Sequence, residues 1–140
     1  MLMNLDFLDA HDRHLNDADQ LFKAQRWANA DHLYGMAAEC GLKQLMIKFG
    51  MDFNYEKWKP VDQNDVKHAD QLWDRYDAYR SGHQQGIHYA LPPSNPFQNW
   101  NVAQRYAHQS HFDENYLLPH QNGANAVSAL IKKAKEEGLL

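Results

Sequence analysis

The chain of 140 residues is long enough for one domain that buries roughly two-thirds of the surface of its unfolded state. Its hydrophobic fraction of 44% and charged fraction of 23% are ordinary for a globular protein, and no apolar run reaches the ~18–20 residues that a membrane-spanning helix needs. The net charge of −4 argues against tight, sequence-independent binding of nucleic acid but is compatible with a small local phosphate site. Cys40 is the only cysteine, which excludes an internal disulfide and favours a reducing, cytoplasmic location.

Two helices are predicted at the start of the chain. Leu5–Gln25 has apolar residues at helical spacing and several early aspartates, so it is predicted to be an amphipathic helix. Trp27–Phe49 contains no proline, is apolar on most sides and is followed by Gly50, a typical stop residue. Its middle contains Gly35 and Gly41, each of which costs about 1 kcal/mol relative to alanine in a helix interior. We therefore expect Trp27–Phe49 to be the closely packed central helix of a bundle.

A connector and a third helix are predicted next. Met51–Pro60 is rich in aromatic residues and is expected to be irregular. Asp62 offers an N-cap, and apolar residues at helical spacing run from Val66 to Tyr79 before Gly82 ends the pattern.

The second half of the chain begins with a long loop. His83–Trp100 contains three of the five prolines, which rules out a continuous helix, and its apolar residues predict that it covers the bundle. Asn101 to about Phe112 is predicted to be a short fourth helix, and Asp113–Gln121 a second connector. The last helix is predicted to begin at Asn122 or Gly123 and to end at Glu137. No strand alternation or internal repeat is evident. The predicted fold class is therefore all-α: a single domain over residues 1–140, folded as an up-and-down bundle of four to five helices.

The sequence RYAHQSH combines Arg105 with His108 and His111. Histidine can donate or accept a proton near neutral pH, and arginine can stabilise the charge of a phosphate, so this set would suit metal-independent RNA cleavage. The spacing alone is uninformative, since about one such arginine–histidine match is expected by chance. Arg26 and His32 form a second match of the same spacing. A solvated helix face therefore remains an open alternative.

Three further features have both a functional and a structural interpretation. Glu39 lies on the apolar central helix and needs a partner, either Lys43 one turn later or a group at a ligand site. His11 and His14, like His108 and His111, are three residues apart and able to share a metal ion, although the Glu-x-x-His motifs of di-iron bundles are absent. Five aromatic residues could stack nucleic-acid bases or serve as core anchors: Trp58, Trp73, Tyr89, Phe97 and Trp100.

Several short motifs resemble the HEPN family of all-helical nucleotide-binding domains. The run from Ala37 to Lys43 is similar to the Ala-Ala-Glu-x-Ala-Leu-Lys signature of the family's second helix. The similarity also includes Ala18-x-x-Leu21, Ala28-x-Ala30, and the later residues Trp100, Arg105, Tyr106 and His111.

This resemblance implies a dimeric helical bundle in which Arg105 and His111 fall on the family's arginine–histidine motif, and Glu39 and Lys43 on its second-helix signature. Members include metal-independent ribonucleases of toxin–antitoxin and defence systems, non-catalytic RNA binders, and partners of small nucleotidyltransferases. Tyr106 departs from the polar residue that follows the arginine in catalytic members, and the proline-rich loop is long. Both departures are compatible with a binding-only member.

The leading hypothesis is a cytoplasmic homodimer that binds RNA or a nucleotide near Arg105 and needs no cofactor or metal. Cleavage would use Arg105 for the phosphate and His111 or His108 for proton transfer. Four residues are expected to contact the substrate: Glu39, Lys43, Tyr106 and Trp100. The alternatives are a non-catalytic module that docks a partner such as a nucleotidyltransferase or an antitoxin, and, with less support, a bundle with a histidine metal site.

Overall fold

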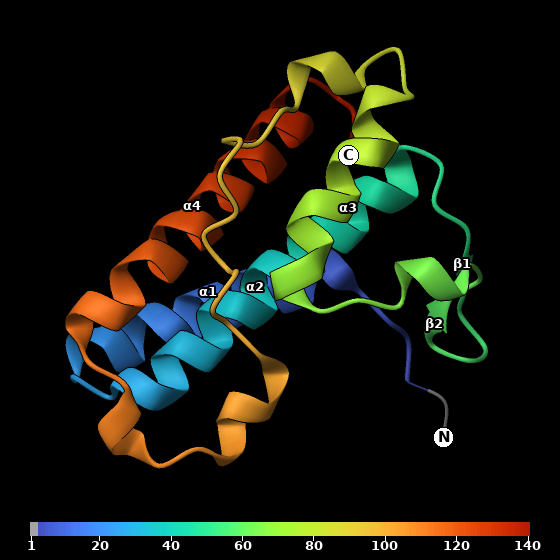
Figure 1. Cartoon of the computed structure of the whole chain (residues 1–140). Coiled ribbons are helices and arrows are strands. Elements are labelled where there is room, and N and C mark those ends of the chain that lie inside the picture. Colours follow the sequence, from blue (N-terminus) through green and yellow to red (C-terminus); the bar gives the residue numbers. More distant parts are fainter. Residues whose placement is uncertain (1–2) are drawn as a thin grey trace.

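The computed structural model describes residues 3–140, and this part of the chain contains four α-helices (Figure 1). They are α1 (Phe7–Lys23), α2 (Trp27–Lys48), α3 (Ala69–Ser81) and α4 (Glu114–Glu136). The all-α class is thus confirmed. None of the helices in this described part is both long and apolar enough to cross a membrane.

The first two helices form an antiparallel pair that agrees with the sequence prediction. The Asp6 carboxylate accepts a hydrogen bond from the backbone N–H of Asp9 and so caps the start of α1. Gln25, in the left-handed backbone region with φ +58°, makes the tight turn into α2. Gly50, with φ +110°, follows the end of α2.

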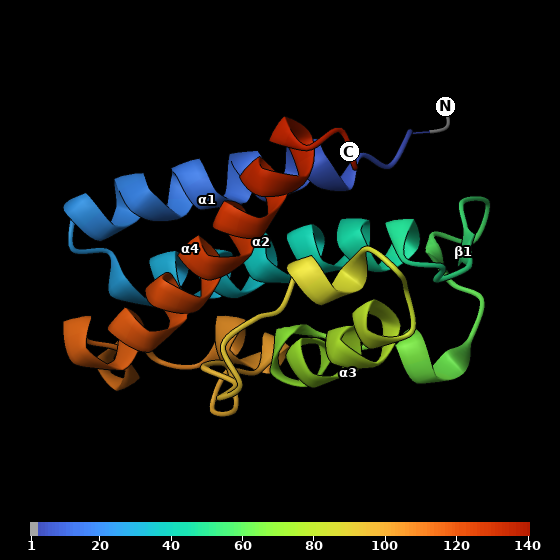
Figure 2. The same cartoon turned by 90° about the horizontal axis from the view of Figure 1, so that it is seen from above.

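Helix α2 is the centre of the molecule, as predicted. It packs against α1, α3 and α4, and both clusters of buried side chains include residues from it. Figure 2 shows α4 crossing α1 and α2 obliquely, while α3 lies on the side of α2 opposite to α1. A Cβ atom on Gly35 would lie 2.0 Å from Cε2 of Trp100, and one on Gly41 would lie 2.5 Å from Cγ1 of Val127. The two glycines are therefore required by close packing.

The segment between α2 and α3 differs from the prediction in two ways. It contains a small antiparallel hairpin of β1 (Phe53–Asn54) and β2 (Lys59–Pro60), where the sequence predicts no strand. The Asp62 cap serves a 3-10 turn, η1 (Gln63–Asp65), and α3 begins only at Ala69. These strands are too short for the period-two alternation that identifies a strand in sequence.

The long loop of residues 83–100 covers the bundle, which confirms that prediction. It includes one 3-10 turn, η2 (Gly86–His88), and then runs between α3 and α4 (Figures 1 and 2). Its own residues Tyr89, Phe97 and Trp100 are buried. Their burial holds the loop against α2 and delivers the chain to the segment that precedes α4.

The predicted helix over 101–112 is wrong. Two 3-10 turns occupy this segment, η3 (Val102–Tyr106) and η4 (Gln109–His111), separated by extended residues. Asn101 and Gln104 form a reciprocal capping box around η3, and the His108 side chain caps η4. Local side-chain-to-backbone bonds of this kind compete with a continuous helix.

The predicted connector over 113–121 is also wrong, because α4 already begins at Glu114. The Asp113 carboxylate accepts a hydrogen bond from the backbone N–H of Tyr116 at 2.8 Å and caps the helix. Pro119 lies inside the helix and removes one backbone bond. Burial of Leu117 and His120 in the same turns offsets that loss.

Candidate functional site

A cleft of about 310 Å³ lies where the α1–α2 turn faces η3 and η4. Residues from two distant parts of the sequence line it: Gln25, Arg26, Trp27, Ala28, Asn29, Gln104, Arg105, Ala107 and Gln109. Most of these side chains are polar, and the only formal charges among them are the two guanidinium groups of Arg26 and Arg105. The cleft is therefore a basic site in an acidic protein.

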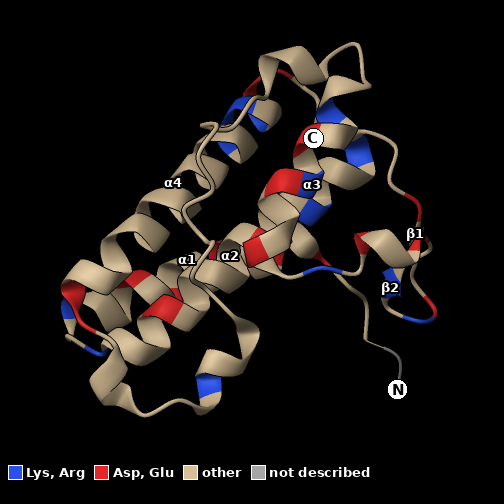
Figure 3. Cartoon of the chain, in the orientation of Figure 1, with Lys and Arg blue, Asp and Glu red and all other residues tan. Residues whose placement is uncertain are grey.

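Both arginines are available to a ligand. Within residues 3–140, neither guanidinium takes part in an ion pair or a hydrogen bond to the protein. The Arg105 guanidinium carbon lies 5.0 Å from the ring centroid of Tyr106, which steadies the side chain without neutralising its charge. Arg105 is also the only charged residue between Pro93 and Phe112, and Figure 3 shows that segment as otherwise uncharged.

The start of α2 adds backbone donors to the same cleft. Arg26 occupies the N-cap position of this 22-residue helix, and its side chain does not cap it. Within the described residues, no group accepts a hydrogen bond from the backbone N–H of Trp27, Ala28 or Asn29. The free N–H groups and the helix dipole favour an anion at this position, in addition to the two arginines.

A buried polar network holds the two walls of the cleft together. Asp31 of α2 and His120 of α4 are both fully buried, and an Asp31 carboxylate oxygen lies 2.5 Å from His120 Nδ1. The other carboxylate oxygen accepts a hydrogen bond from the Gln104 side chain of η3. His120 Nε2 lies 2.7 Å from the Asn99 side-chain oxygen in the long loop. This network fixes η3, and with it Arg105, relative to the start of α2.

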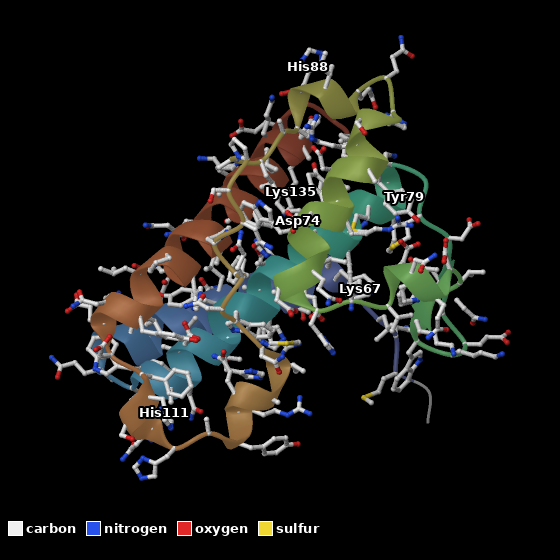
Figure 4. The ribbon with its side chains drawn as sticks, in the orientation of Figure 1. Lys67, Asp74, Tyr79, His88, His111 and Lys135 are labelled. Carbon is white, nitrogen blue, oxygen red and sulfur yellow. The ribbon has the colours of Figure 1, made fainter. Side chains whose placement is uncertain are left out.

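Neither histidine of the predicted catalytic set lines the cleft. His108 is exposed, and its Nδ1 accepts a hydrogen bond from the backbone N–H of Ser110 at 3.1 Å. His111 is also exposed and lies on the turn that precedes α4 (Figure 4). Only Arg105 of the predicted trio contributes to the cleft, because the break between η3 and η4 replaces the expected helix face.

The structure decides the partner of Glu39. The buried carboxylate accepts a hydrogen bond from Lys43 Nζ at 3.1 Å, and its second oxygen lies 2.9 Å from His68 Nδ1. Burial by itself raises the pKa of Glu39, but the bonds to His68 and Lys43 outweigh this effect and lower it. Glu39 and Lys43 thus pair with each other, as the structural alternative predicts, and neither lines the arginine cleft.

The two aromatic residues expected to contact substrate lie in different environments. Tyr106 is 79% exposed and lies beside Arg105, but it is not among the residues that line the cleft. Trp100 is 1% exposed, and its indole N–H donates to the backbone oxygen of Asp31 at 3.1 Å. Trp100 therefore supports the cleft from the core and is not among the residues that line it.

Other potential sites have different chemistry. A cavity of about 460 Å³ between α3 and the long loop is lined by two aspartates, and Asp74 among them is labelled in Figure 4. Its one cation, Arg80, pairs with Asp77, so it does not suit a phosphate. Among residues 3–140, no group of three or more metal-ligating side chains is close enough to hold an ion. Burial raises the pKa of the Cys40 thiol to about 12, which leaves it unreactive.

Sequence reasoning missed Arg26 and the network of Asp31 and His120. Arg26 does appear in the second arginine–histidine match, Arg26 to His32, but that match is no stronger than the chance expectation. Asp31 lies within an otherwise apolar helix face, the same signal that marks Glu39. No local pattern identifies its partner His120, which is 89 residues away.

No family model, no curated protein sequence and no solved structure matches the chain.

Proposed function

We propose that this protein binds a phosphate-bearing ligand, RNA or a nucleotide, in the cleft between the start of α2 and η3. The observation that carries the proposal is the convergence of Arg26 and Arg105, both unpaired, on one cleft. Arginine binds phosphate oxygens through a planar fork of N–H donors, and the free N–H groups of α2 add to the same field.

The surroundings of the two arginines fit a nucleotide. Trp27 lines the cleft and packs edge-on against Phe22, which leaves an aromatic surface near the phosphate position. Asn29, Gln104 and Gln109 supply amide groups that can hydrogen-bond to a base or a ribose. The HEPN resemblance supports the same ligand class. Because His108 and His111 lie outside the cleft lining, binding is better supported than cleavage.

The binding test uses a 5′-phosphorylated single-stranded RNA oligonucleotide and the variants Arg26→Ala and Arg105→Ala. Each variant should weaken binding by about tenfold or more, because each removes a charge-assisted contact worth about 1.5–3 kcal/mol. Arg13→Ala is the matched control, since Arg13 is an exposed arginine paired with Asp9, away from the cleft lining. Equal affinity in all three variants and in the unaltered protein would refute the proposal.

The same preparation tests cleavage. Incubation with RNA in the presence of EDTA, followed by gel analysis, reports metal-independent nuclease activity. Activity that disappears in both Arg105→Ala and His111→Ala would support a ribonuclease. Binding without cleavage in any variant would support a binding-only protein.

A second candidate function, docking of a partner protein, is favoured by exposed apolar side chains around the β1–β2 hairpin. Tyr55, Trp58, Val61 and Val66 are between 43% and 65% exposed there. The HEPN resemblance implies a homodimer and partners such as a nucleotidyltransferase or an antitoxin. Sedimentation of the purified chain measures self-association, and Trp58→Ala should shift the mass toward the monomer if the hairpin is the dimer surface.

A further inference from the structure

His32 lies one turn of α2 beyond the helix residues that line the arginine cleft, and is not itself one of the lining residues. Ala28 and Asn29, which line the cleft, precede His32 by four and three residues, a spacing that places side chains on one helix face. The imidazole stacks on the buried Trp100 ring, with centroids 5.9 Å apart and planes within 12°. The ring is therefore held in a fixed orientation next to the start of α2.

The two ring nitrogens of His32 have different surroundings. Nδ1 is buried and has no hydrogen-bond partner among the described residues. The residue as a whole is only partly buried, which leaves the Nε2 edge as the exposed part of the ring. Buried N–H groups without a partner are rarer in folded proteins than buried acceptors without one. The favoured tautomer consequently carries its proton on Nε2.

The charges around His32 keep the ring neutral. Burial lowers the pKa of His32, and the Arg105 guanidinium lowers it further, while the carboxylates of Asp31 and Glu39 oppose this only in part. His14 of α1 faces the same region. Its pKa is lowered mainly by burial, then by the charge of Arg13, and also by His32. Trp100, on which the ring stacks, and Gln104, which donates to the adjacent Asp31, belong to the segment that carries Arg105, so the imidazole lies close to that wall of the cleft.

We infer that His32 is the third anion-binding side chain of the cleft, donating a hydrogen bond from Nε2–H to the bound phosphate while the ring remains neutral. This inference rests on the anion-binding function proposed above. It adds to that function a residue, His32, that lies outside the predicted motif of Arg105 and His111. The neutral ring also argues against a general-base role, because a free Nε2 lone pair would require the buried Nδ1 to carry the proton.

The test titrates the full-length protein with sodium sulfate, which stays dianionic across the neutral range. His32→Phe keeps the stack on Trp100 and removes the donor, and should weaken sulfate binding by about tenfold. His32→Gln places an amide N–H near the Nε2 position and should retain affinity within about threefold. His88→Ala removes an exposed histidine at the opposite end of the molecule from His111 (Figure 4) and should bind as the unaltered protein does.

Nitrogen NMR of the imidazole and the pH dependence give a second readout. The Nε2 signal of His32 should be the protonated one and should shift on sulfate addition, and sulfate affinity should stay flat between about pH 7 and about pH 8. Affinity that rises over this range as pH falls would overturn the inference, as would unchanged binding in His32→Phe. If Arg105→Ala loses sulfate binding and His32→Phe does not, the inference about His32 fails and the proposed function stands. If Arg105→Ala binds sulfate as the unaltered protein does, the inference and the proposed function are both refuted.

Discussion

At the residue scale, the chemistry of this protein depends on which polar groups are paired and which are free. Asp31, Glu39 and His120 are buried, and each has a charged or hydrogen-bonding partner. Arg26 and Arg105 differ from these groups, because they face a cleft and neither guanidinium has a partner among residues 3–140. The buried carboxylates already have hydrogen-bonding partners, so they do not compete for the two arginines. The arginines are therefore available to an external anion.

Removal of one member of the Asp31–His120 pair should be strongly destabilising. His120→Ala leaves the Asp31 carboxylate buried without its main partner, and we expect the free energy of unfolding to fall by about 3–5 kcal/mol. Denaturant unfolding measures the change. In a double-mutant cycle, Asp31→Asn with His120→Ala should cost clearly less than the sum of the single variants. Simple additivity would show that the two side chains do not interact.

The Glu39–His68 pair should make stability depend on pH. Its hydrogen bond to Glu39 raises the pKa of His68, against the effect of burial, so this contribution is present below the ordinary histidine pKa and is lost as pH rises through the raised value. At the acid end, it is lost as pH falls through the lowered pKa of Glu39. His68 is more than half exposed, so the change should stay below about 1 kcal/mol.

Unfolding curves across this pH range provide the measurement, and His68→Gln provides the control. The variant should lose the alkaline part of the pH dependence and keep the rest. A variant curve that follows the unaltered protein throughout would assign the effect to another group.

At the scale of elements, the long loop can pack closely against α2 because α2 has a glycine, Gly35, at the point of contact with Trp100. Gly35→Ala would place a Cβ atom inside the space of the Trp100 ring, and we expect a loss of about 1–3 kcal/mol in stability together with a changed tryptophan fluorescence. Gly82→Ala is the matched control, because its Cβ would lie 3.7 Å from the nearest backbone oxygen and should change stability by less than about 0.5 kcal/mol. Equal losses in the two variants would contradict the packing argument.

The elements also show where sequence periodicity succeeds. Both α1 and α2 follow their predicted ranges closely, because each has a clear apolar pattern and a recognisable end. The boundaries predicted between Asn101 and Gln121 are wrong, since side-chain caps at Asn101 and His108 break the first part of this segment into short turns. Pro119 looks like a helix breaker in sequence, yet it lies within α4 because burial of its neighbours outweighs the lost backbone bond.

At the scale of the whole molecule, a net charge of −4 surrounds a cleft that carries two positive charges. Figure 3 shows acidic and basic residues on α3 and around the hairpin, without an extended basic face there. Binding of RNA should therefore be local and only mildly salt-dependent. With two phosphate contacts, the plot of log affinity against log salt concentration should have a slope of about −1 to −2.

Titration of the RNA oligonucleotide at several salt concentrations measures this slope. Arg105→Ala should make it shallower by about 0.7, the contribution of one contact to a single strand. A slope several times steeper would mean that a larger basic surface, built in an assembly of chains, contacts the RNA.

The sequence by itself determined the all-α class, the central role of α2 and the burial of the proline-containing loop, because these follow from local periodicity and from the spacing of glycine and proline. It also singled out Arg105, which lines a cleft in the structure. Only the tertiary structure decided which groups accompany Arg105, bringing Arg26 into the same cleft and leaving His108 and His111 outside the cleft lining. The reason is that the cleft joins segments about 80 residues apart, and their register is set by long-range contacts such as Asp31–His120, which no local pattern encodes.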